Sequence, residues 1–374
     1  MKYYIIAGEA SGDLYGAELA KAIKNIDKNA ILRGFGGNKM AATKVDLVRH
    51  YKDMAFMGIF EVIKNIKKIR QNFAIAKDDI NKFSPNAVIL IDYPGFNLKL
   101  AKYLKSKELT IFYFIPPKVW AWKKKRIYQL KKYTDKIFVI FPFEVNFYKK
   151  FGITVEYFGN PLIDIINEKL KFFNAQKFRQ EYQIPSQKKI VALLPGSRLQ
   201  EISRVLPYYE QLTRDFPNIN FILAGISTLK EAYKINPQKN LHIIYDKTYE
   251  ILSISDAAVV VSGTATLETA ILKIPQIVVY IPGFLTYFIG KALINIPYIS
   301  LVNIIAGKKV VPEIIQHKFY ARLSYELNNL LNNKEIQGKM KQEYQKIIST
   351  LKSNNQNKVI ENIAEKIISF LREC

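Results

Sequence analysis

Short apolar runs recur along the first half of the chain and are separated by longer amphipathic stretches. Residues 3–7, 87–91, 110–115 and 137–141 form such runs. Each has the length and composition of a strand that is buried on both faces. Strands that alternate with helices of about ten to fifteen residues are typical of βαβ units. The pattern therefore predicts an open parallel sheet in this half.

The same alternation starts again after a polar, lysine-rich stretch. The second series of apolar runs comprises residues 189–194, 219–224, 241–244, 257–261 and 276–280. From residue 319 onward the sequence is polar and helix-forming, with leucines and isoleucines that supply apolar helix faces. We therefore predict a second α/β sheet followed by packing helices.

Together these patterns predict an α/β protein with two doubly wound, Rossmann-like domains that face a cleft. A chain of 374 residues is long enough for two separate cores. The expected division is a first domain at 1–162, a linker and helix at 163–187, a second domain at 188–316, and C-terminal helices at 317–374. Ligands of such sheets bind beyond the carboxyl ends of the strands, so the segments that follow strands are the candidates for chemistry.

The charge balance indicates a preference for anions. The net charge is +24, and residues 1–162 hold 29 basic against 14 acidic residues. A positive field attracts nucleic acid, anionic lipid headgroups and phosphorylated substrates alike, so it selects none of them. Lysine-rich helix faces exposed to solvent are the plain alternative.

Cysteine usage and the amino-terminal sequence indicate a cytoplasmic protein. The single cysteine, Cys374, permits no intrachain disulfide and no cysteine-based metal site. The first apolar run is too short for a signal peptide, and the uncharged stretch 274–290 is interrupted by Pro275, Pro282 and Gly283. We expect cytoplasmic residence and, at most, peripheral contact with a membrane.

The segment after the first predicted strand, residues 8–13 (GEASGD), combines two glycines with a serine and an aspartate. A helix is expected to begin near Leu14. An N-cap formed by Asp13 or Ser11 would explain most of this segment, but it would not explain Glu9.

Asp92 stands directly after the predicted strand 87–91 and is followed by Tyr93, Pro94 and Gly95. A carboxylate at this place can act as a general base once burial or a neighbour has tuned its pKa. An aspartate before Pro-Gly is also an ordinary turn residue. Both interpretations stay open from the residues alone.

Residues 195–201 (PGSRLQE) offer a glycine turn, a hydroxyl, an arginine and a helix start in succession. All four features favour a phosphate, and Arg198 is suited to neutralise a diphosphate leaving group. The alternative is a surface turn with a solvated arginine.

Residues 260–268 (VVSGTATLE) also end a strand and open a helix, with small residues that permit close approach of a ligand. Glu268 lies about one turn into that helix and is suited to bind the ribose hydroxyl pair. The alternative is a capping arrangement in which Ser262 or Thr264 caps the helix and Glu268 interacts with its amino terminus.

In their order, these segments resemble the successive signatures of the lipid-A-disaccharide synthase family. The resemblance rests on residues 8–13, 91–97, Trp120-Ala121-Trp122, 195–198 and 262–268, with further similar segments at 57–62, 141–144 and 300–307. Each motif is weak by itself, but the ordered set is specific. The match runs from residue 3 to about residue 316.

The resemblance implies a GT-B glycosyltransferase that transfers 2,3-diacylglucosamine from UDP-2,3-diacylglucosamine to 2,3-diacylglucosamine 1-phosphate (lipid X). The products are a β-1,6-linked disaccharide 1-phosphate and UDP, and the anomeric centre is inverted. One direct displacement needs a base on the acceptor hydroxyl and stabilisation of the departing diphosphate. No metal or other cofactor is expected, because the UDP-sugar is a substrate.

The resemblance also implies roles for individual residues. Asp92 matches the candidate base for the acceptor 6-hydroxyl, Arg198 matches the position that faces the donor diphosphate, and Glu9 and Asp13 are further catalytic candidates. The remaining expected residues are Gly8, Ser11 and Gly12 on the acceptor side, and Gly196, Ser197, Ser262, Gly263, Thr264, Glu268 and Asn303 around the donor.

Two departures from the family pattern are visible. Gly95 stands where many relatives carry aspartate, and Pro117-Lys118 replaces a pair that commonly contains serine. Gly95 leaves Asp92 as the only acid of its loop, which weakens any mechanism with two carboxylates there.

The basic surface suits contact with an anionic membrane, and we expect a peripheral location on the cytoplasmic face of the inner membrane. Residues 59–70 combine an apolar stripe with lysines, and residues 123–126 add a second basic cluster. Such a helix can lie among acidic headgroups. A core-facing helix with a solvated basic back is the alternative.

Three other functions compete with this one. Trp120 and Trp122 beside lysines also fit a nucleic-acid binder, but no nucleic-acid partner is expected, because it gives no reason for glycine-rich strand ends in both halves. A glycosyltransferase that acts on lipid-linked peptidoglycan precursors is a nearer alternative, against which residues 8–13 argue. An NAD-dependent dehydrogenase would need Gly-x-Gly-x-x-Gly after the first strand, which is absent.

Overall fold

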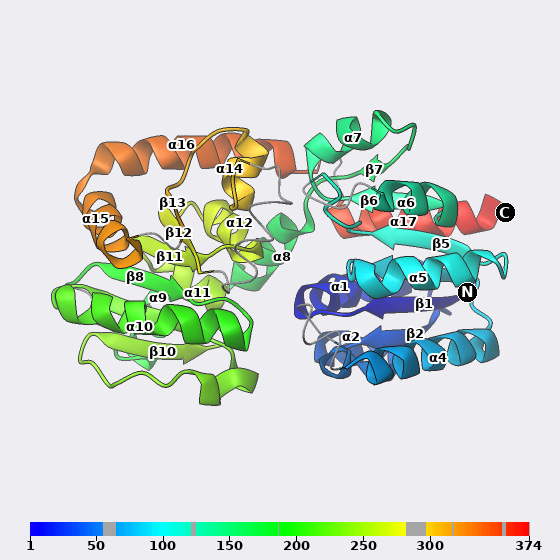
Figure 1. Ribbon diagram of the computed structural model, residues 1–374, viewed down its shortest axis with the longest axis horizontal. Helices are drawn as coiled ribbons and strands as arrows, with labels where there is room; N and C mark the ends of the chain where they lie inside the picture. Colours follow the sequence, from blue (N-terminus) through cyan, green and yellow to red (C-terminus); the bar gives the residue numbers. More distant parts are fainter. Residues whose placement is uncertain are drawn as a thin grey trace. The chain divides into compact units, whose positions relative to one another are not determined.

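The computed structural model of the chain divides it into two compact units (Figure 1). It describes residues 1–54, 65–120, 125–185, 187–281, 297–315, 318–353 and 357–373. Unit 1 comprises Met1–Pro161 and Leu351–Cys374, and unit 2 comprises Leu162–Thr350.

The described part of unit 1 contains a seven-stranded parallel sheet in the order β3-β2-β1-β4-β5-β6-β7. Its strands are β1 (Lys2–Ala7), β2 (Ile31–Gly36), β3 (Asp46–His50), β4 (Ala87–Ile91), β5 (Thr110–Phe114), β6 (Lys136–Val139) and β7 (Glu156–Tyr157). The strand order reverses at β1, which pairs with β2 on one side and with β4 on the other. Ligands of doubly wound sheets bind at such a switch point.

Helices cover both faces of this sheet, and its central strands β1, β4 and β5 are buried at almost every position. The helical elements of unit 1 are α1 (Ala10–Ile26), α2 (Asn38–Ala42), η1 (Tyr51–Asp53), α4 (Ile66–Phe83), α5 (Pro94–Lys105), α6 (Arg126–Tyr133), α7 (Pro142–Lys149) and α17 (Val359–Glu373). Tyr4, Val88 and Tyr113 belong to one core with residues of α4, α5 and α6. On the other face, the ring of Phe112 meets Phe370 of α17 edge-on at 5.6 Å.

The last helix of the chain returns to the first sheet. Figure 1 shows α17, in red, beside elements of unit 1, and the backbone N–H of Asn160 donates to the carbonyl of Leu351 at 2.8 Å. Gly159 permits this close approach with φ +117, since a Cβ there would lie 2.9 Å from the Ser353 nitrogen. We expected residues 317–374 to form one group of C-terminal helices. The structure divides them, because the buried Ile363 and Ile367 of α17 complete the core of unit 1.

Unit 2 repeats the architecture with six parallel strands among its described residues, in the order β10-β9-β8-β11-β12-β13. These are β8 (Ile190–Leu194), β9 (Asn220–Gly225), β10 (Leu241–Tyr245), β11 (Ala257–Val261), β12 (Gln276–Tyr280) and β13 (Glu313–Ile315). The helical elements are α8 (Pro161–Leu170), α9 (Ala175–Glu181), α10 (Leu199–Asp215), η2 (Ser227–Ala232), α11 (Thr248–Ser253), α12 (Thr264–Ile271), α14 (Leu301–Ala306), α15 (Phe319–Asn332) and α16 (Lys334–Leu351).

The stretch 163–187, which we expected to be a linker and helix, belongs to unit 2. It carries most of α8 and all of α9, and Phe178 and Ile184 lie in the core beneath β8. Two buried apolar side chains therefore fasten the segment to the second sheet.

Candidate active site

The carboxyl ends of β1 and β4 bring two predicted motifs of unit 1 together. The ring of Tyr93 covers Gly8 so closely that a Cβ on Gly8 would lie 2.3 Å from the Tyr93 Cγ atom. Burial, and then the nearby charge of Glu9, raise the pKa of Tyr93 to about 12. The Tyr93 hydroxyl donates to the carbonyl of Met54 at 2.6 Å. Glu9 and the Asp92 loop thus share one edge of the sheet.

Asp92 is held by its main chain in an unusual conformation. Asp92 and Tyr93 have φ values of 46 and 47 in the left-handed region, which costs a non-glycine residue on the order of 1 kcal/mol. The Asp92 carbonyl accepts hydrogen bonds from the Tyr113 hydroxyl and the Asn97 amide, both at 2.8 Å. The Asp92 N–H donates to Phe114 at 3.1 Å. These bonds fix the point from which the half-buried carboxylate projects.

Asp13 binds the start of α2 and does not cap α1. Helix α1 begins at Ala10, so both Asp13 and Ser11 lie inside it. The Asp13 carboxylate accepts backbone N–H groups of Gly37 at 2.7 Å, Lys39 at 3.1 Å and Met40 at 3.1 Å. It is 3% exposed. This geometry favours a positioning role at the start of α2 over direct catalysis.

The other residues of the first motif lie in or beside the first turn of α1. Ser11 is half-buried, and Gly12 is buried against the end of β1. A Cβ on Gly12 would lie 3.3 Å from the Cβ of Ala7, so the helix packs closely on its own strand.

Sequence reasoning gave no role to Glu144, which is a buried acid at the same edge of unit 1. Its Oε2 atom accepts the N–H groups of Phe141 and Ile140 at 3.1 and 3.3 Å, and its Oε1 atom accepts the indole N–H of Trp120 at 3.1 Å. Burial raises the pKa of Glu144 to about 7, although these donors and the charge of Lys118 oppose the rise. The contact becomes visible only when the loop after β5, which carries Trp120, lies beside the start of α7.

In unit 2, the turn after β8 is built around a carboxylate from the following helix. Gly196 has φ +92, and a Cβ there would lie within 3.0 Å of the Glu201 side chain. Glu201 accepts the N–H of Ser197 at 3.1 Å and the guanidinium of Arg198 at 2.9 Å. Arg198, whose side chain is 51% exposed, is the N-cap residue of α10. Its guanidinium therefore stands at the amino terminus of a long helix.

Electrostatics connect this turn to the end of β12. Burial, and then the charge of Glu201, raise the pKa of Tyr280, whereas the charges of Arg198 and Arg204 lower it. Arg204 also donates to the carbonyl of Ile281 at 3.4 Å. The carboxyl edge of unit 2 thus gathers Arg198, Arg204 and Glu201 near Tyr280.

The turn after β11 is open above its glycine. Gly263, not Ser262 or Thr264, is the N-cap residue of α12, so the capping arrangement that we considered for those two side chains is wrong. The Ser262 hydroxyl donates instead to the carbonyl of Ile299 at 2.7 Å. A Cβ on Gly263 would meet nothing within 4 Å. Glu268 accepts the hydroxyl of Tyr249 at 3.0 Å.

Asn303 is fully buried and its amide is engaged within unit 2. Its Nδ2 atom donates to the Val311 carbonyl at 3.0 Å and to Glu313 at 2.8 Å. Its Oδ1 atom accepts the N–H groups of Val310 and Val311 at 2.7 and 2.9 Å. These bonds tie α14 to the start of β13. They favour a positioning role over the direct contact with the donor that we predicted for Asn303.

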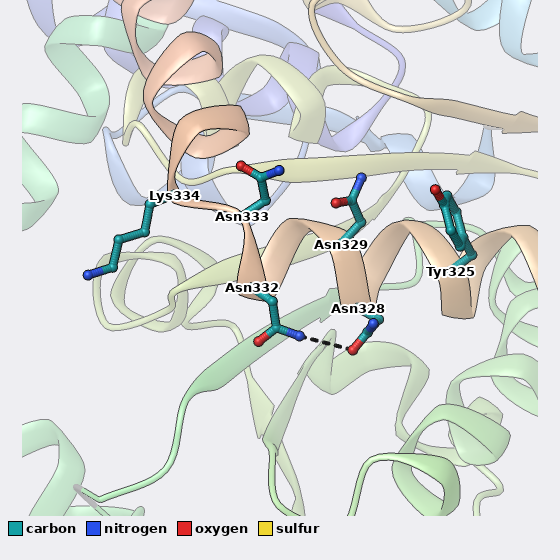
Figure 2. Close-up of a pocket in the computed structure, with 6 residues that line it drawn as sticks. All are labelled: Tyr325, Asn328, Asn329, Asn332, Asn333 and Lys334. Carbon is teal, nitrogen blue, oxygen red and sulfur yellow. Dashed lines mark hydrogen bonds between the residues drawn. The ribbon is translucent and has the colours of Figure 1, made fainter.

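A hollow of about 600 Å³ lies at the opposite edge of the second sheet (Figure 2). It is lined by Tyr325, Asn328, Asn329, Asn332, Asn333 and Lys334. Lys189, which precedes β8, donates to the carbonyl of Leu331 at 2.6 Å, so this part of α15 lies at the amino ends of the strands. Figure 2 shows the amides of Asn328 and Asn332 bonded to each other. The hollow contains none of the predicted site residues.

The predicted membrane surface is only partly described. Residues 57–62, Lys64, Trp122, Lys123 and Lys124 lie outside the described residues. Lys67 and Lys68 on α4 are exposed. Of the helices that the structure describes, none is long and apolar enough to cross a bilayer. Within the same residues, no group of three or more His, Cys, Asp or Glu side chains is arranged to hold a metal ion, and independence from metals stays a prediction.

Comparison with solved structures defines the class of protein. The UDP-GlcNAc 2-epimerase from Neisseria meningitidis, solved with UDP-GlcNAc bound, superposes with a TM-score of 0.65 at 15% identity over the whole of both chains. The glycosyltransferase SnogD from Streptomyces nogalater gives a TM-score of 0.54 at 14% identity over 99% of each chain. The protein therefore has the GT-B fold of two Rossmann-like domains.

Comparison of sequences identifies the family. The family model described as lipid-A-disaccharide synthetase matches residues 3–367. The lipid-A-disaccharide synthase of Geobacter metallireducens is 38% identical over 88% of this chain and 87% of its own length. That of Nitrosococcus oceani is 35% identical over 96% and 94%. The chain belongs to the lipid-A-disaccharide synthase family, and it is a glycosyltransferase.

Proposed function

We propose that this enzyme transfers 2,3-diacylglucosamine from UDP-2,3-diacylglucosamine to the 6-hydroxyl of lipid X, with inversion. The products are the β-1,6-linked lipid A disaccharide 1-phosphate and UDP. Membership of the family supports this reaction over transfer to a peptidoglycan precursor and over nucleic-acid binding. In this proposal unit 1 binds the acceptor and unit 2 binds the donor.

The observation that carries the proposal is the fixed position of Asp92 at the carboxyl end of β4. The acceptor oxygen attacks the anomeric carbon of the donor, and the bond from that carbon to the diphosphate oxygen breaks on the opposite face. The hydroxyl proton passes to the Asp92 carboxylate, and the electron pair leaves with UDP. A base that hydrogen bonds hold in place needs little reorganisation for this step.

The donor end of the reaction has suitable groups in unit 2. Arg198 and the amino terminus of α10 offer positive charge to a diphosphate. The space above Gly263 permits close approach of the nucleotide. Glu268, with its bond to Tyr249, is suited to the ribose hydroxyls. No metal takes part in this proposal, because these groups supply the charge that the leaving diphosphate needs.

The acylated substrates favour work at a membrane surface, and we place the enzyme on the cytoplasmic face of the inner membrane. Exposed Lys67 and Lys68, next to Ile66 at 46% exposure, support contact with anionic headgroups. Flotation with vesicles of acidic phospholipid tests this. We expect replacement of both lysines by glutamate to release the protein, and undiminished flotation would contradict the assignment.

The reaction itself is tested by UDP release from UDP-2,3-diacylglucosamine in detergent micelles, with and without lipid X. We expect release that depends on the acceptor and that falls by about 10²- to 10⁴-fold in Asp92→Asn, because the amide cannot accept the proton. If an active family member releases UDP in the same micelles while this chain does not, the substrate assignment fails. Full activity of Asp92→Asn would reject the base and leave the reaction standing.

A further inference from the structure

We propose that Trp120 forms an apolar wall for the acylated acceptor in unit 1, and that Glu144 is the positioning residue that fixes its indole ring. This inference rests on the proposed function, since it names a further part of the acceptor site.

The ring of Trp120 is anchored at one end and packed along one side. Its indole N–H points to Glu144, with 3.1 Å between Nε1 and Oε1. Phe143 meets it edge-on, with ring centroids 5.2 Å apart, and Phe143 stacks on Phe141 at 5.6 Å. Trp120 and Phe143 are only half-buried. The polar end of the indole is therefore turned into the protein, and the accessible remainder is apolar.

This aromatic cluster lies at the same sheet edge as Asp92. Strands β4, β5 and β6 are neighbours in parallel, so their carboxyl ends lie together. Trp120 follows β5, whose Tyr113 holds the Asp92 carbonyl, and Phe141 and Phe143 follow β6. An acceptor whose hydroxyl meets Asp92 would therefore extend its apolar portion toward this wall.

Helix capping explains only part of the arrangement of Glu144. The bonds from Ile140 and Phe141 to Oε2 resemble a capping box at the start of α7. An exposed glutamate would cap the helix equally well, without the cost of burying a carboxyl group. Glu144 is nevertheless 2% exposed, and its second oxygen reaches the loop after β5. The additional bond orients Trp120.

The hydrogen bond between Trp120 and Glu144 should depend on pH, because Glu144 ionises. Burial raises its pKa to about 7, so its charge changes near neutrality. The groups that face it are Trp120, Lys118, Tyr148 and Tyr157. The pKa of each tyrosine is raised, first by burial and then by the Glu144 charge, so both stay neutral in this range. Because an ionised carboxylate accepts a stronger hydrogen bond, the hold on Trp120 weakens as the pH falls through about 7.

The experiment uses Trp120 as its own reporter. The chain has two tryptophans, so Trp122→Phe leaves Trp120 as the only tryptophan, and excitation at the red edge of absorption selects it over the tyrosines. In this background we expect its emission to change between about pH 6 and pH 8, and Glu144→Gln to abolish that change. Acceptor KM should rise about three-fold in Glu144→Gln and in Trp120→Phe, and about ten-fold in Trp120→Ala. Donor KM should stay within about two-fold throughout.

Combining the variants separates positioning from general damage. Trp120→Phe removes the indole donor and Glu144→Gln only weakens the acceptor of the same hydrogen bond, so the double variant should show no rise in acceptor KM beyond that of Trp120→Phe. Multiplying effects would overturn the positioning role. Tyr128→Ala removes a 67% exposed aromatic side chain of the same unit and should leave acceptor KM unchanged. If Glu144→Gln does not fold, the Trp120 variants still test the apolar wall, because they leave the hydrogen bonds from Ile140 and Phe141 to Glu144 in place.

The inference and the proposed function fail in different ways. A native chain without acceptor-dependent UDP release removes the proposed function. Release that proceeds with an unchanged acceptor KM in Trp120→Ala removes the apolar wall alone.

Discussion

The two sheets end in loops of opposite character. In unit 1 the turn after β4 is made by Asp92 and Tyr93, which are non-glycine residues in the left-handed region, with buried hydrogen bonds around them. In unit 2 the turns after β8 and β11 are made by Gly196 and Gly263. The turn after β4 is fixed by crowding, whereas the turn after β11 is open above Gly263 and the turn after β8 carries Arg198 at the start of a helix.

This difference corresponds to two chemical demands. A base must stay at one place relative to the hydroxyl that it deprotonates, and dense packing around a strained turn provides this. A diphosphate needs close approach to N–H groups and positive charge, which bulky side chains would block. The same doubly wound topology therefore meets both demands through its choice of turn residues.

The largest effects are expected when a glycine at each sheet edge is replaced by alanine, because the added methyl group tests how crowded that edge is. Gly8→Ala places a Cβ 2.3 Å from the Tyr93 ring, so we expect the free energy of unfolding to fall by about 3 kcal/mol, with loss of turnover as Tyr93 moves. Gly263→Ala meets nothing within 4 Å, and its φ of 163 is extended backbone that alanine adopts. That variant should unfold within about 0.5 kcal/mol of the native chain but bind the donor more weakly.

Denaturant unfolding together with donor KM measures both effects. Equal destabilisation by the two substitutions would contradict the contrast between a crowded and an open edge. A Gly263→Ala variant with unchanged donor KM would show that the space above this glycine is not used by the nucleotide.

Two arginines at the two ends of α10 form a matched pair that tests the predicted donor role of Arg198. Arg198 and Arg214 each pair with a glutamate at 2.9 Å and have side chains that are 51% and 52% exposed. Arg198 stands at the amino end of the helix, where a cation opposes the dipole, and Arg214 stands at the favourable carboxyl end. We expect Arg198→Ala to lower kcat/KM about 100-fold by removing charge from the leaving group.

The control variant should affect stability rather than kinetics. Arg214→Ala should leave kcat/KM within about two-fold and reduce stability by a few tenths of a kcal/mol, since it loses a favourable end charge. Steady-state kinetics and thermal unfolding of both variants provide the comparison. Similar kinetic losses in the two would mean that Arg198 has no particular place in the donor site.

The fold could be predicted where strands are continuously apolar. Residues 87–91, 257–261 and 276–280 coincide with β4, β11 and β12, which are buried at almost every position. The sequence pattern did not predict β2, which contains Arg33 and two glycines, β3, none of whose residues is fully buried, or the short strands β7 and β13. Such strands owe their existence to pairing with a neighbour, and no local pattern records that pairing.

Sequence reasoning located the loops of the candidate site, but not the division of labour within them. Asp13 and Asn303 stand in the right motifs, and the structure shows that their polar atoms bond to backbone groups distant in the sequence. Glu144 gains its interest from Trp120, which lies 24 residues before it. Whether the polar atoms of a side chain are hydrogen-bonded within the protein or available to a ligand depends on such distant partners. These partners are visible only in the folded structure.

The smallest expected effect concerns Gly95, which leaves Asp92 as the only acid of its loop. A Cβ there would meet nothing within 4 Å, and the residue lies in the first turn of α5. Gly95→Asp should raise stability by about 1 kcal/mol, because it removes a flexible residue from the unfolded chain and places a negative charge at a helix amino terminus. Gly95→Asn is the neutral control and should give a smaller gain. Turnover should stay within about two-fold in both variants, since Asp92 remains the base. A ten-fold faster Gly95→Asp enzyme, unmatched by Gly95→Asn, would instead mean that a second carboxylate assists the reaction at this edge.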